Sequence, residues 1–376
     1  MKIKVLELFS GIGACSKALE RLGIEHEIVD AVEIDKYAVK SFNAIHNTNF
    51  EPQDICEWDK DIEVDLIMHG SPCQDFSLAG KQAGGDKDSG TRSSLMYETI
   101  RIVEKLKPKY VIWENVKNLL SKKHRHNFDA YLETMEQLGY TNYYQVLNAK
   151  DYGIPQNRER VFTISIRDDS CYAMYDGEEY YEDYSCNFEF PPKQELKLKL
   201  KDMLEDEVDE KYYLSDKMVK YISATGTKTF KNPDCKINLD VARPLTTDQN
   251  KRAGTTNYLC DELPPNYDLS MPINKPKVLG SIGEKKSNGG TQWYQQDRIY
   301  DNNVGLSLST TAQPYYPDKQ LRIRKLTPCE CWKLMGFDKS DFDKASKVNS
   351  NAQLYKQAGN SIVVNVLEAI LTNLLK

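Results

Sequence analysis

Residues 1–167 alternate short apolar runs with segments whose apolar residues recur at helical spacing. The apolar runs predict strands at Lys4–Phe9, Glu27–Val32, Val64–His69, Tyr110–Trp113, Tyr143–Asn148 and Val161–Ile166. The segments with helical spacing are Ala14–Leu22, Tyr37–Ile45, Tyr97–Leu106 and Phe128–Leu138. Strands and helices that alternate in this way are typical of βαβ units, so we predict an α/β fold with a mostly parallel sheet.

The pattern changes after Arg167. Residues 168–210 are acidic and rich in tyrosine, and residues 211–320 are rich in Gly, Asn, Thr, Pro and Gln. This composition predicts a surface insertion followed by a smaller, loop-rich and β-rich domain. Helical spacing returns at Cys329–Met335 and Ser361–Leu375, and we expect the last helix to pack against the first sheet. We therefore divide the chain into residues 1–168, 169–320 and 321–376.

The charge of the chain does not exclude a nucleic-acid partner. The net charge is −6, but residues 171–210 alone hold 13 acidic residues and 4 lysines. The rest of the chain is therefore slightly positive. Binding to nucleic acid depends on local positive patches more than on the total charge.

Cysteine usage and the lack of long apolar runs predict a cytoplasmic protein. The nine cysteines form no paired CxxC arrangement, which favours free thiols over disulfides. The N-terminus lacks the apolar region of a signal peptide. No apolar run approaches the roughly 20 residues that a membrane helix needs, so we expect no membrane contact.

Polar residues follow two of the predicted strands. Gly70-Ser-Pro-Cys73-Gln comes after the third strand, and a Gly-rich loop at 78–85 follows it. Cys73 is either an inert buried thiol or a nucleophile under a closing loop. Glu114 follows the fourth strand and either caps the next helix or faces Cys73, because strands of one sheet place their carboxyl ends side by side.

Two arginines precede the last strand of this region. Arg158 and Arg160 stand two positions apart, so we expect them to point to the same side. They either form a surface salt-bridge cluster or hold a polar substrate near Cys73.

A second constellation is typical of a nucleoside-containing cofactor. Phe9-Ser-Gly-Ile-Gly13 links the first strand to the first helix, and Glu33 ends the second strand. An acidic residue at that position usually holds a ribose hydroxyl. Asp54-Ile55 lies near the next strand edge. A GxG pattern alone is weak evidence for a cofactor site, but its occurrence together with Glu33 strengthens this interpretation.

Five segments occur in an order that resembles one enzyme family. They are Phe9-Ser-Gly-Ile-Gly13, Gly70-Ser-Pro-Cys-Gln74, Glu114-Asn-Val116, Gln156-Asn-Arg-Glu-Arg160 and Gln357-Ala-Gly-Asn-Ser-Ile362. This set is similar to the motifs of the bacterial DNA (cytosine-5)-methyltransferases, over residues 1–167 and 320–376. The segment between corresponds in position to the target-recognition region of that family. The resemblance implies a class I S-adenosylmethionine-dependent methyltransferase fold, which is Rossmann-like.

The resemblance also implies a catalytic set. Cys73 would attack cytosine C6 as a thiolate, Glu114 would hydrogen-bond the N3 edge, and Arg160 would hold O2 with Arg158 supporting the pocket. Covalent addition makes C5 nucleophilic enough to take a methyl group, and loss of the C5 proton then expels Cys73. A stacked cytosine does not admit this geometry, so the base must be flipped out of duplex DNA.

The implied cofactor is S-adenosyl-L-methionine. Phe9 would stack on adenine, Glu33 would bind the ribose hydroxyls and Asp54 would accept from the adenine amino group. The full set implied is Phe9, Gly11, Gly13, Glu33, Ile34, Asp54, Ile55, Leu95 and Asn360. The chain departs from the family pattern at Ile34, Gln53 and Cys329, where Trp, Gly and Arg are common.

A DNA-reading loop is expected late in the middle region. The stretch 289–300 is either an exposed polar loop or a loop that approaches DNA closely. In the second case Gln295 would occupy the space that the flipped cytosine leaves, and Arg298 would read a guanine. Phosphate contacts would come from Ser307, Ser309 and Thr310.

Three other functions compete with DNA cytosine methylation. The long middle region disfavours methylation of tRNA by the same chemistry. The intact catalytic set disfavours a DNA-binding protein without catalytic activity. A zinc deaminase is disfavoured because the chain lacks a His/Cys-x-x-Cys constellation, so we expect no metal. We expect a monomer that acts on double-stranded DNA, with any cognate restriction endonuclease acting separately.

Overall fold

The computed structural model describes residues 2–72, 92–168, 172–175, 178–181, 187–215, 239–247, 257–260, 278–281, 298–300 and 323–375. The chain divides into two compact units. The first comprises Met1–Leu204, Asp240–Gln249 and Pro328–Lys376, and the second comprises Glu205–Leu239 and Asn250–Thr327. Residues 187–204 and 240–247 thus lie in the first unit, although the division drawn from the sequence places them in the range 169–320.

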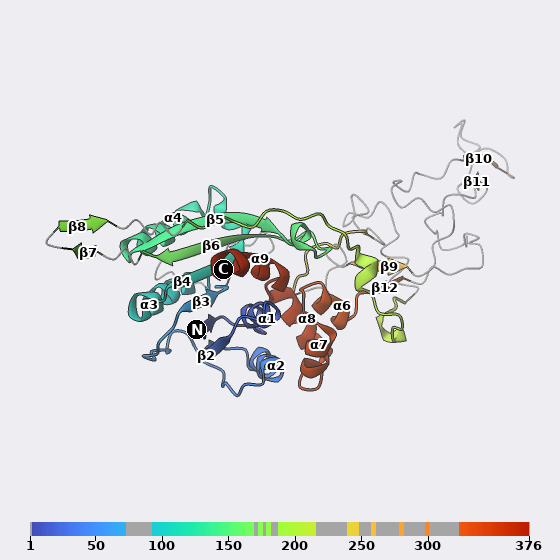
Figure 1. Ribbon diagram of the computed structural model, residues 1–376. Coiled ribbons are helices and arrows are strands. Elements are labelled where there is room, and N and C mark those ends of the chain that lie inside the picture. Colours follow the sequence, from blue (N-terminus) through green and yellow to red (C-terminus); the bar gives the residue numbers. More distant parts are fainter. Residues whose placement is uncertain are drawn as a thin grey trace. The chain divides into compact units, whose positions relative to one another are not determined.

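A six-stranded sheet forms the centre of the first unit, with the strand order β2-β1-β3-β4-β6-β5 (Figure 1). The strands are β1 (Ile3–Leu8), β2 (His26–Val32), β3 (Leu66–His69), β4 (Tyr110–Val116), β5 (Tyr140–Asn148) and β6 (Glu159–Arg167). Strands β1 to β4 pair in parallel, and β6 is antiparallel to both β4 and β5. Five strands therefore point the same way, which confirms the mostly parallel α/β fold.

Helices connect these strands and follow them in the chain. The α-helices are α1 (Ala14–Arg21), α2 (Lys36–His46), α3 (Met96–Leu106), α4 (Arg125–Gln137), α6 (Pro328–Lys333), α7 (Lys339–Ser346), α8 (Asn351–Asn360) and α9 (Val364–Leu375). Short 3-10 turns are η1 (Arg92–Leu95), η2 (Lys117–Leu120), η3 (Ala149–Tyr152) and η4 (Leu200–Met203).

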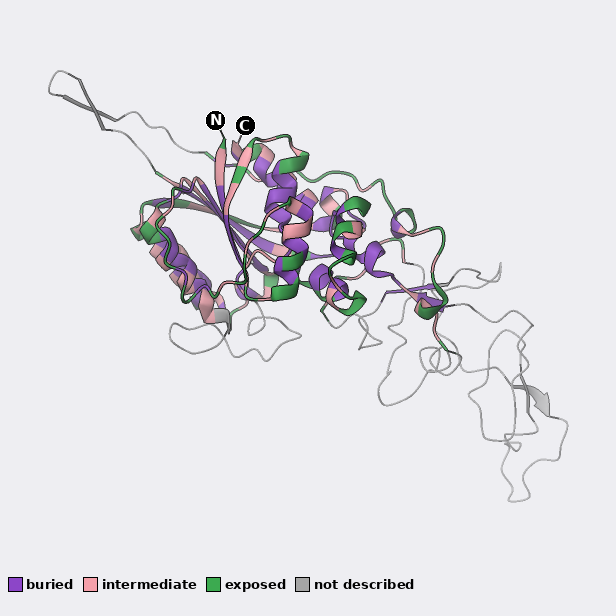
Figure 2. Ribbon diagram, turned by 90° about the horizontal axis from the view of Figure 1, so that it is seen from below, coloured by how far each residue is buried: buried purple, intermediate pink, exposed green. Residues whose placement is uncertain are grey.

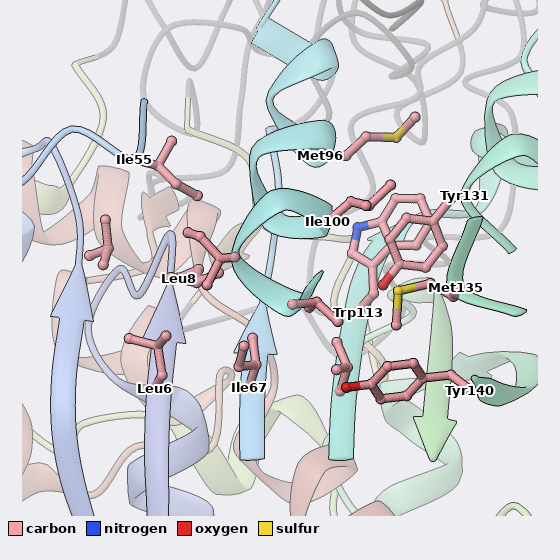
Figure 3. Close-up of a cluster of buried hydrophobic side chains, with 14 of the residues drawn as sticks. Leu6, Leu8, Ile55, Ile67, Met96, Ile100, Trp113, Tyr131, Met135 and Tyr140 are labelled. Atoms are coloured by element: carbon pink, nitrogen blue, oxygen red, sulfur yellow. The ribbon is translucent and has the colours of Figure 1, made fainter. Parts of the chain in front are cut away.

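Alternate residues of the strands face opposite layers of helices. Leu6, Ile67 and Trp113 belong to a buried cluster with residues of α3 and α4 (Figure 3). Neighbouring strand positions face the other way: the carboxylate of Glu7 accepts hydrogen bonds from Ser16 in α1. Figure 2 shows the buried residues running along the central strands and the inner sides of the helices. Successive side chains of each strand point to opposite faces of the sheet, so they contact different layers of helices.

The C-terminal helices return to the first unit. Helix α9 packs beside α1, and Arg21 of α1 forms an ion pair with Glu368 at 2.8 Å. Lys17 of α1 is buried and pairs with Asp341 of α7 at 3.1 Å. Residues more than 300 positions apart in the chain are therefore held together by paired charges as well as by apolar packing.

One stretch, Asn351–Leu375, is long and apolar enough to cross a membrane by length and composition. The expectation from the sequence concerned unbroken apolar runs, and Asn360, Ser361, Asn365 and Glu368 interrupt this stretch. This stretch consists of α8 and α9 with a non-helical break at 361–363, and half of its most apolar window is buried inside the protein. That burial is what a core helix of a globular protein shows.

The described part of the second unit consists of short antiparallel strand pairs and a 3-10 turn. Strand β9 (Tyr258–Cys260) pairs with β12 (Ile323–Lys325), and β10 (Val278–Ser281) pairs with β11 (Arg298–Tyr300). The turn is η5 (Glu210–Tyr212). A separate hairpin in the first unit comprises β7 (Tyr172–Tyr175) and β8 (Glu178–Tyr181). Short strands are what the loop-rich composition of this region predicts.

Candidate active site

The loop between β1 and α1 has an unusual backbone. Phe9, Gly11 and Gly13 have φ values of 53°, 55° and 80°, in the left-handed region. Gly13 also lies close to α2, because a Cβ atom there would be 2.1 Å from Nε2 of His46. Only glycine fits at this position, and the Ser16 amide in the first turn of α1 already donates to the buried Glu7 carboxylate.

Glu33 lies directly after β2, beside this loop. Its Oε2 accepts the Gly11 amide at 3.1 Å, and its Oε1 accepts the Asp35 amide at 2.8 Å. Burial raises the pKa of Glu33, against the lowering effect of the two amides. A carboxylate has about four acceptor positions, so Glu33 retains capacity for further donors such as ribose hydroxyls.

Gln53 fixes the neighbouring loop to Glu33 and to β2. Its backbone amide donates to the carbonyl of Glu33 at 2.9 Å. Its side-chain Nε2 donates to Asp30 Oδ1 at 2.8 Å and to the carbonyl of Ala31 at 3.1 Å. A glycine at this position would lack the side-chain bonds. The departure from the family pattern therefore adds a local anchor for Asp54.

Asp30 is the buried centre of that anchor. It is 1% exposed and also accepts from Trp58 Nε1 at 2.8 Å and Lys60 Nζ at 2.6 Å. Burial by itself would raise the pKa of Asp30, but hydrogen bonds from Lys60, Trp58 and Gln53 hold it below its usual value. The anchor is therefore an ionised carboxylate with its acceptor positions filled.

The apolar residues expected around the cofactor lie together. Ile55 is buried in the cluster that α3 and α4 form with the sheet, and Phe9 and Leu95 border that cluster. Asp54 is exposed and accepts the amide of Cys56 at 3.0 Å. Ile34, which follows Glu33 directly, is 68% exposed.

Helix α8 brings Asn360 to the same region. Gln357 accepts from Ser41 of α2 at 2.9 Å and donates to the carbonyl of Tyr37 at 2.9 Å. Lys356 pairs with Asp35 at 2.6 Å. These bonds fasten α8 to the start of α2, two residues after Glu33. Asn360 is exposed at the end of α8.

The carboxyl end of β3 leads toward Cys73, which lies outside the described residues. Ser71 is buried, and its Oγ accepts a hydrogen bond from Trp113 Nε1 at 2.9 Å. Asn115 donates to the Ser71 carbonyl at 3.4 Å. A Cβ on Gly70 would be 3.8 Å from Glu114 Oε2. The described start of the Gly70–Gln74 motif therefore lies against β4 and beside Glu114.

Glu114 and Arg160 form an ion pair across β4 and β6. Glu114 Oε1 is 3.0 Å from Arg160 Nε, and the two side chains are 11% and 20% exposed. Glu114 lies opposite Phe162 and Arg160 lies opposite Val116, so the pair is diagonal on one face of the sheet. This contact is made inside the fold, so the alternative of a surface cluster does not describe Arg160.

Arg158 contacts main-chain carbonyls from distant segments. It is 4% exposed, and its guanidinium donates to the carbonyls of Leu245, Gly359 and Ser361 at 3.0, 3.2 and 2.9 Å. Gly359 lies close to the 245–247 segment, because a Cβ there would be 2.6 Å from Thr246. Arg158 therefore joins β6 to two other parts of the chain.

A small pocket collects the arginines and Glu114. Its lining residues are Glu114, Leu147, Ala149, Arg158, Arg160, Phe162, Ile362, Val363 and Val366. They come from β4, β5, η3, β6 and the start of α9, so the last helix contributes to the same face of the sheet as Glu114. Both arginines do face one pocket, as their spacing predicts. Arg160 forms the ion pair with Glu114.

The expected DNA-reading residues fall largely outside the described part of the chain. Gln295, Ser307, Ser309 and Thr310 lie outside the described residues. Arg298 begins β11, and only its backbone is described.

Sequence reasoning missed several contacts that shape this site. Gln156 donates to the carbonyl of Leu334 at 2.8 Å and accepts the amide of Leu245 at 3.1 Å. The bond between Trp113 and Ser71 was also unforeseen. Gln156 and Ser71 lie within the motifs and Trp113 flanks one. Their place in or beside a motif was the only sequence feature that pointed to these contacts.

Comparisons with known proteins agree with this geometry. Residues 3–376 match the model of the family described as C-5 cytosine-specific DNA methylase. The chain is 32% identical to the orphan methyltransferase M.SPRI of Bacillus phage SPR, with 100% of this chain and 98% of that protein covered. It is 31% identical to the type II methyltransferase M.HhaI of Haemophilus parahaemolyticus, with 99% and 94% covered.

The fold has a solved counterpart. The structure of a Spodoptera frugiperda DNMT2 mutant matches with a TM-score of 0.65 at 22% identity and covers 100% of both chains. At that identity the likeness concerns the fold alone. The family model and the two relatives cover almost the entire chain, and so the chain belongs to the family of C-5 cytosine-specific DNA methylases.

Proposed function

We propose that this protein methylates C5 of a cytosine that is flipped out of a specific double-stranded DNA sequence. Its catalytic residues in this proposal are Cys73, Glu114, Arg158 and Arg160. The observation that carries this proposal is the largely buried pair of Glu114 and Arg160 beside Gly70, which stands three residues before Cys73. The carboxyl group of Glu114 and the guanidinium of Arg160 line one pocket, where they suit N3 and O2 of a cytosine. In the chain, Cys73 follows the adjacent strand β3.

Each side chain has a defined task in this proposal. The Cys73 thiolate forms a bond to C6, while Glu114 hydrogen-bonds N3 and stabilises the charge that develops on the ring. Arg160 donates to O2. After C5 has taken the methyl group, a base removes the C5 proton, the ring electrons return and the S–C6 bond breaks. Cys73 is thereby restored as a thiolate.

The described residues fit S-adenosyl-L-methionine as the methyl donor. Glu33 offers acceptor capacity for ribose hydroxyls, and Ile34 offers an exposed apolar surface for adenine. The buried Ser10 hydroxyl, between Phe9 and Gly11, has no hydrogen-bond partner within the described ranges. A bound polar ligand would satisfy it. When bound, S-adenosylmethionine supplies an electrophilic methyl group.

The residues between 169 and 320 are proposed to read the DNA sequence. Arg298 would pair with guanine O6 and N7, and Gln295 would fill the space of the flipped base. Replacing Arg298 with Ala should relax selectivity at one guanine, at a cost of roughly 1–3 kcal/mol. Ser307→Ala should weaken binding to all sequences alike. Methylation of a randomised DNA library, read by bisulfite sequencing, compares the two variants.

Covalent trapping tests the proposed chemistry. DNA that contains 5-fluorocytosine should form a stable adduct with the wild type, because fluorine at C5 does not leave as a proton. Peptide mapping should find the adduct at Cys73. The Cys73→Ser variant should form none while still binding DNA. An adduct at another cysteine, or none with the wild type, contradicts the assignment.

Parallel assays separate DNA from tRNA as the substrate. We expect methylation of duplex DNA, a monomeric enzyme, and any cognate restriction endonuclease acting as a separate protein. Bisulfite sequencing of DNA from a host that expresses the chain would identify the site and the modified base together. Methyl transfer to tRNA alone would instead favour the RNA substrate.

A further inference from the structure

Side-chain hydrogen bonds hold the start of the segment that leads from β3 to Cys73, after the point where β3 and β4 stop pairing. The pairing of β3 with β4 ends where His69 lies opposite Trp113. Beyond it, Ser71 accepts from Trp113 Nε1 at 2.9 Å, and Asn115 donates to the Ser71 carbonyl at 3.4 Å. Ser71, Trp113 and Asn115 are 3%, 1% and 1% exposed. The three groups therefore interact in a site from which water is largely excluded.

Trp113 is itself held in place by a stack of rings. Its indole is stacked on the His69 ring at 5.6 Å with an interplanar angle of 5°. Tyr131 of α4 packs against it at 4.2 Å (Figure 3). His69 Nε2 lies 3.2 Å from the Tyr131 hydroxyl, and its Nδ1 lies 3.4 Å from the Thr99 hydroxyl. The indole N–H has little freedom to turn away from Ser71.

His69 in this stack is neutral. It is fully buried, and burial lowers the pKa of His69 to about 3. One ring nitrogen is then a donor and the other an acceptor, which suits two hydroxyl partners. No charge change in the stack is expected between pH 5 and 9, so its geometry should not vary with pH in that range.

We propose that Trp113 is a positioning residue for the nucleophile: its indole N–H holds Ser71 and thereby sets where the Cys73 segment leaves the sheet. Cys73 is two residues after Ser71, so their Cα atoms are at most about 7 Å apart. Trp113 precedes Glu114 on β4, so one short stretch of chain orients both partners of the flipped base. A displacement of about 1 Å in such a pair is enough to slow a reaction roughly 100-fold.

This inference rests on the proposed function, because it concerns the attack of Cys73 on cytosine. The test compares Trp113→Phe, Ser71→Ala, the double variant and Ser71→Thr, which keeps the hydroxyl. Tyr131→Phe is the matched control, since it removes a hydroxyl from the same stack and leaves the bond between Trp113 and Ser71 intact. The measurements are the rate of adduct formation with saturating 5-fluorocytosine DNA, the Kd for DNA and the unfolding midpoint.

We expect adduct formation to slow roughly 10- to 100-fold in Trp113→Phe and in Ser71→Ala, with unchanged Kd for DNA. The double variant should be no slower than the slower single variant, because both single changes remove the bond between Trp113 and Ser71, and Ser71→Ala removes in addition the 3.4 Å contact from Asn115 Nδ2 to Ser71 Oγ. Ser71→Thr should stay near the wild-type rate. If Trp113→Phe does not fold, Ser71→Ala and Ser71→Thr carry the comparison.

Three outcomes overturn the inference while the proposed function stands. They are single variants within about 2-fold of the wild-type rate, multiplicative effects in the double variant, or an equal loss in Tyr131→Phe. A wild type that forms no adduct at Cys73 overturns the proposed function and this inference with it. The two failures are distinguished by the wild-type reaction alone.

Discussion

Glu33 and Glu114 both stand at the carboxyl end of a parallel strand, but different kinds of partner hold them. Glu33 accepts two main-chain amides from adjacent loops, those of Gly11 and Asp35. Glu114 is paired with the guanidinium of Arg160, a side chain from the antiparallel strand β6. Main-chain amides remain when side chains change. The cofactor end therefore depends on loop conformation, and the substrate end depends on individual side chains.

This difference predicts how each end responds to substitution. Changes near Glu33 should act gradually, because the amides persist in most variants. Changes near Glu114 should act abruptly, because the loss of one partner leaves a largely buried charge unpaired. Four predictions follow this contrast, in descending order of the expected effect.

Glu114→Gln should reduce kcat by about 10²- to 10³-fold, the usual cost of losing one group that stabilises charge in the transition state. The amide is close in size to the carboxyl group but carries no charge to pair with Arg160. The measurement is single-turnover methylation at saturating DNA. Glu159→Gln is the control, since Glu159 forms an exposed pair with Lys117 and should keep near-normal kcat. Equal losses in both variants would contradict the contrast.

Arg158→Lys should lower the free energy of unfolding by about 3 kcal/mol, since a lysine does not reach all three carbonyls that the guanidinium joins. The measurement is urea unfolding. Arg125→Lys is the matched control on the surface, where Arg125 pairs with Asp129, and should cost about 0.5 kcal/mol or less. A full loss of activity with unchanged stability would instead place Arg158 among residues that touch the substrate.

Glu7→Gln should change how stability depends on pH. Burial raises the pKa of Glu7 to about 7, while the unfolded chain ionises near 4.5. The folded wild type therefore keeps a proton that the unfolded chain has lost, and its stability falls as pH rises from about 4.5 to 7. The variant does not ionise, so its stability relative to wild type should rise over that range by about 3 kcal/mol.

Urea unfolding at pH 5 and pH 8 measures this difference for Glu7. His46 and His69, whose pKa values burial lowers to about 4 and about 3, titrate in both proteins and cancel. A difference between variant and wild type that is the same at both pH values would mean that Glu7 is ionised in the folded protein throughout.

Glu33→Ala should weaken S-adenosylmethionine binding by about 1.5–3 kcal/mol, the usual contribution of a charge-assisted hydrogen bond. Asp54→Ala should weaken it less, because Asp54 is exposed and water competes for its bonds. Calorimetric titration measures both affinities without relying on activity. If neither variant binds more weakly, the map of the cofactor site is wrong.

Strand boundaries show where sequence patterns end. The pattern predicts a strand at Tyr110–Trp113, whereas β4 continues through Glu114, Asn115 and Val116. These residues pair with Phe162, Val161 and Arg160 of β6. Polar residues extend a strand when a partner strand is present, and the partner is not visible in the local pattern. The same cause extends β6 to Glu159 and Arg167.

The sequence by itself determined the α/β alternation, the position of the polar motifs at strand ends and the family. The alternation and the motif positions follow from periodicity, which is a local property, and the family follows from the resemblance of five motifs in their order along the chain. Tertiary structure alone decided that Arg160 pairs with Glu114, that Trp113 holds Ser71, and which carbonyls Arg158 binds. The carbonyls that Arg158 contacts lie 87 to 203 positions away in the chain. Spacing fixes the face of a strand on which a side chain lies, but the partner that it meets there depends on how distant segments pack.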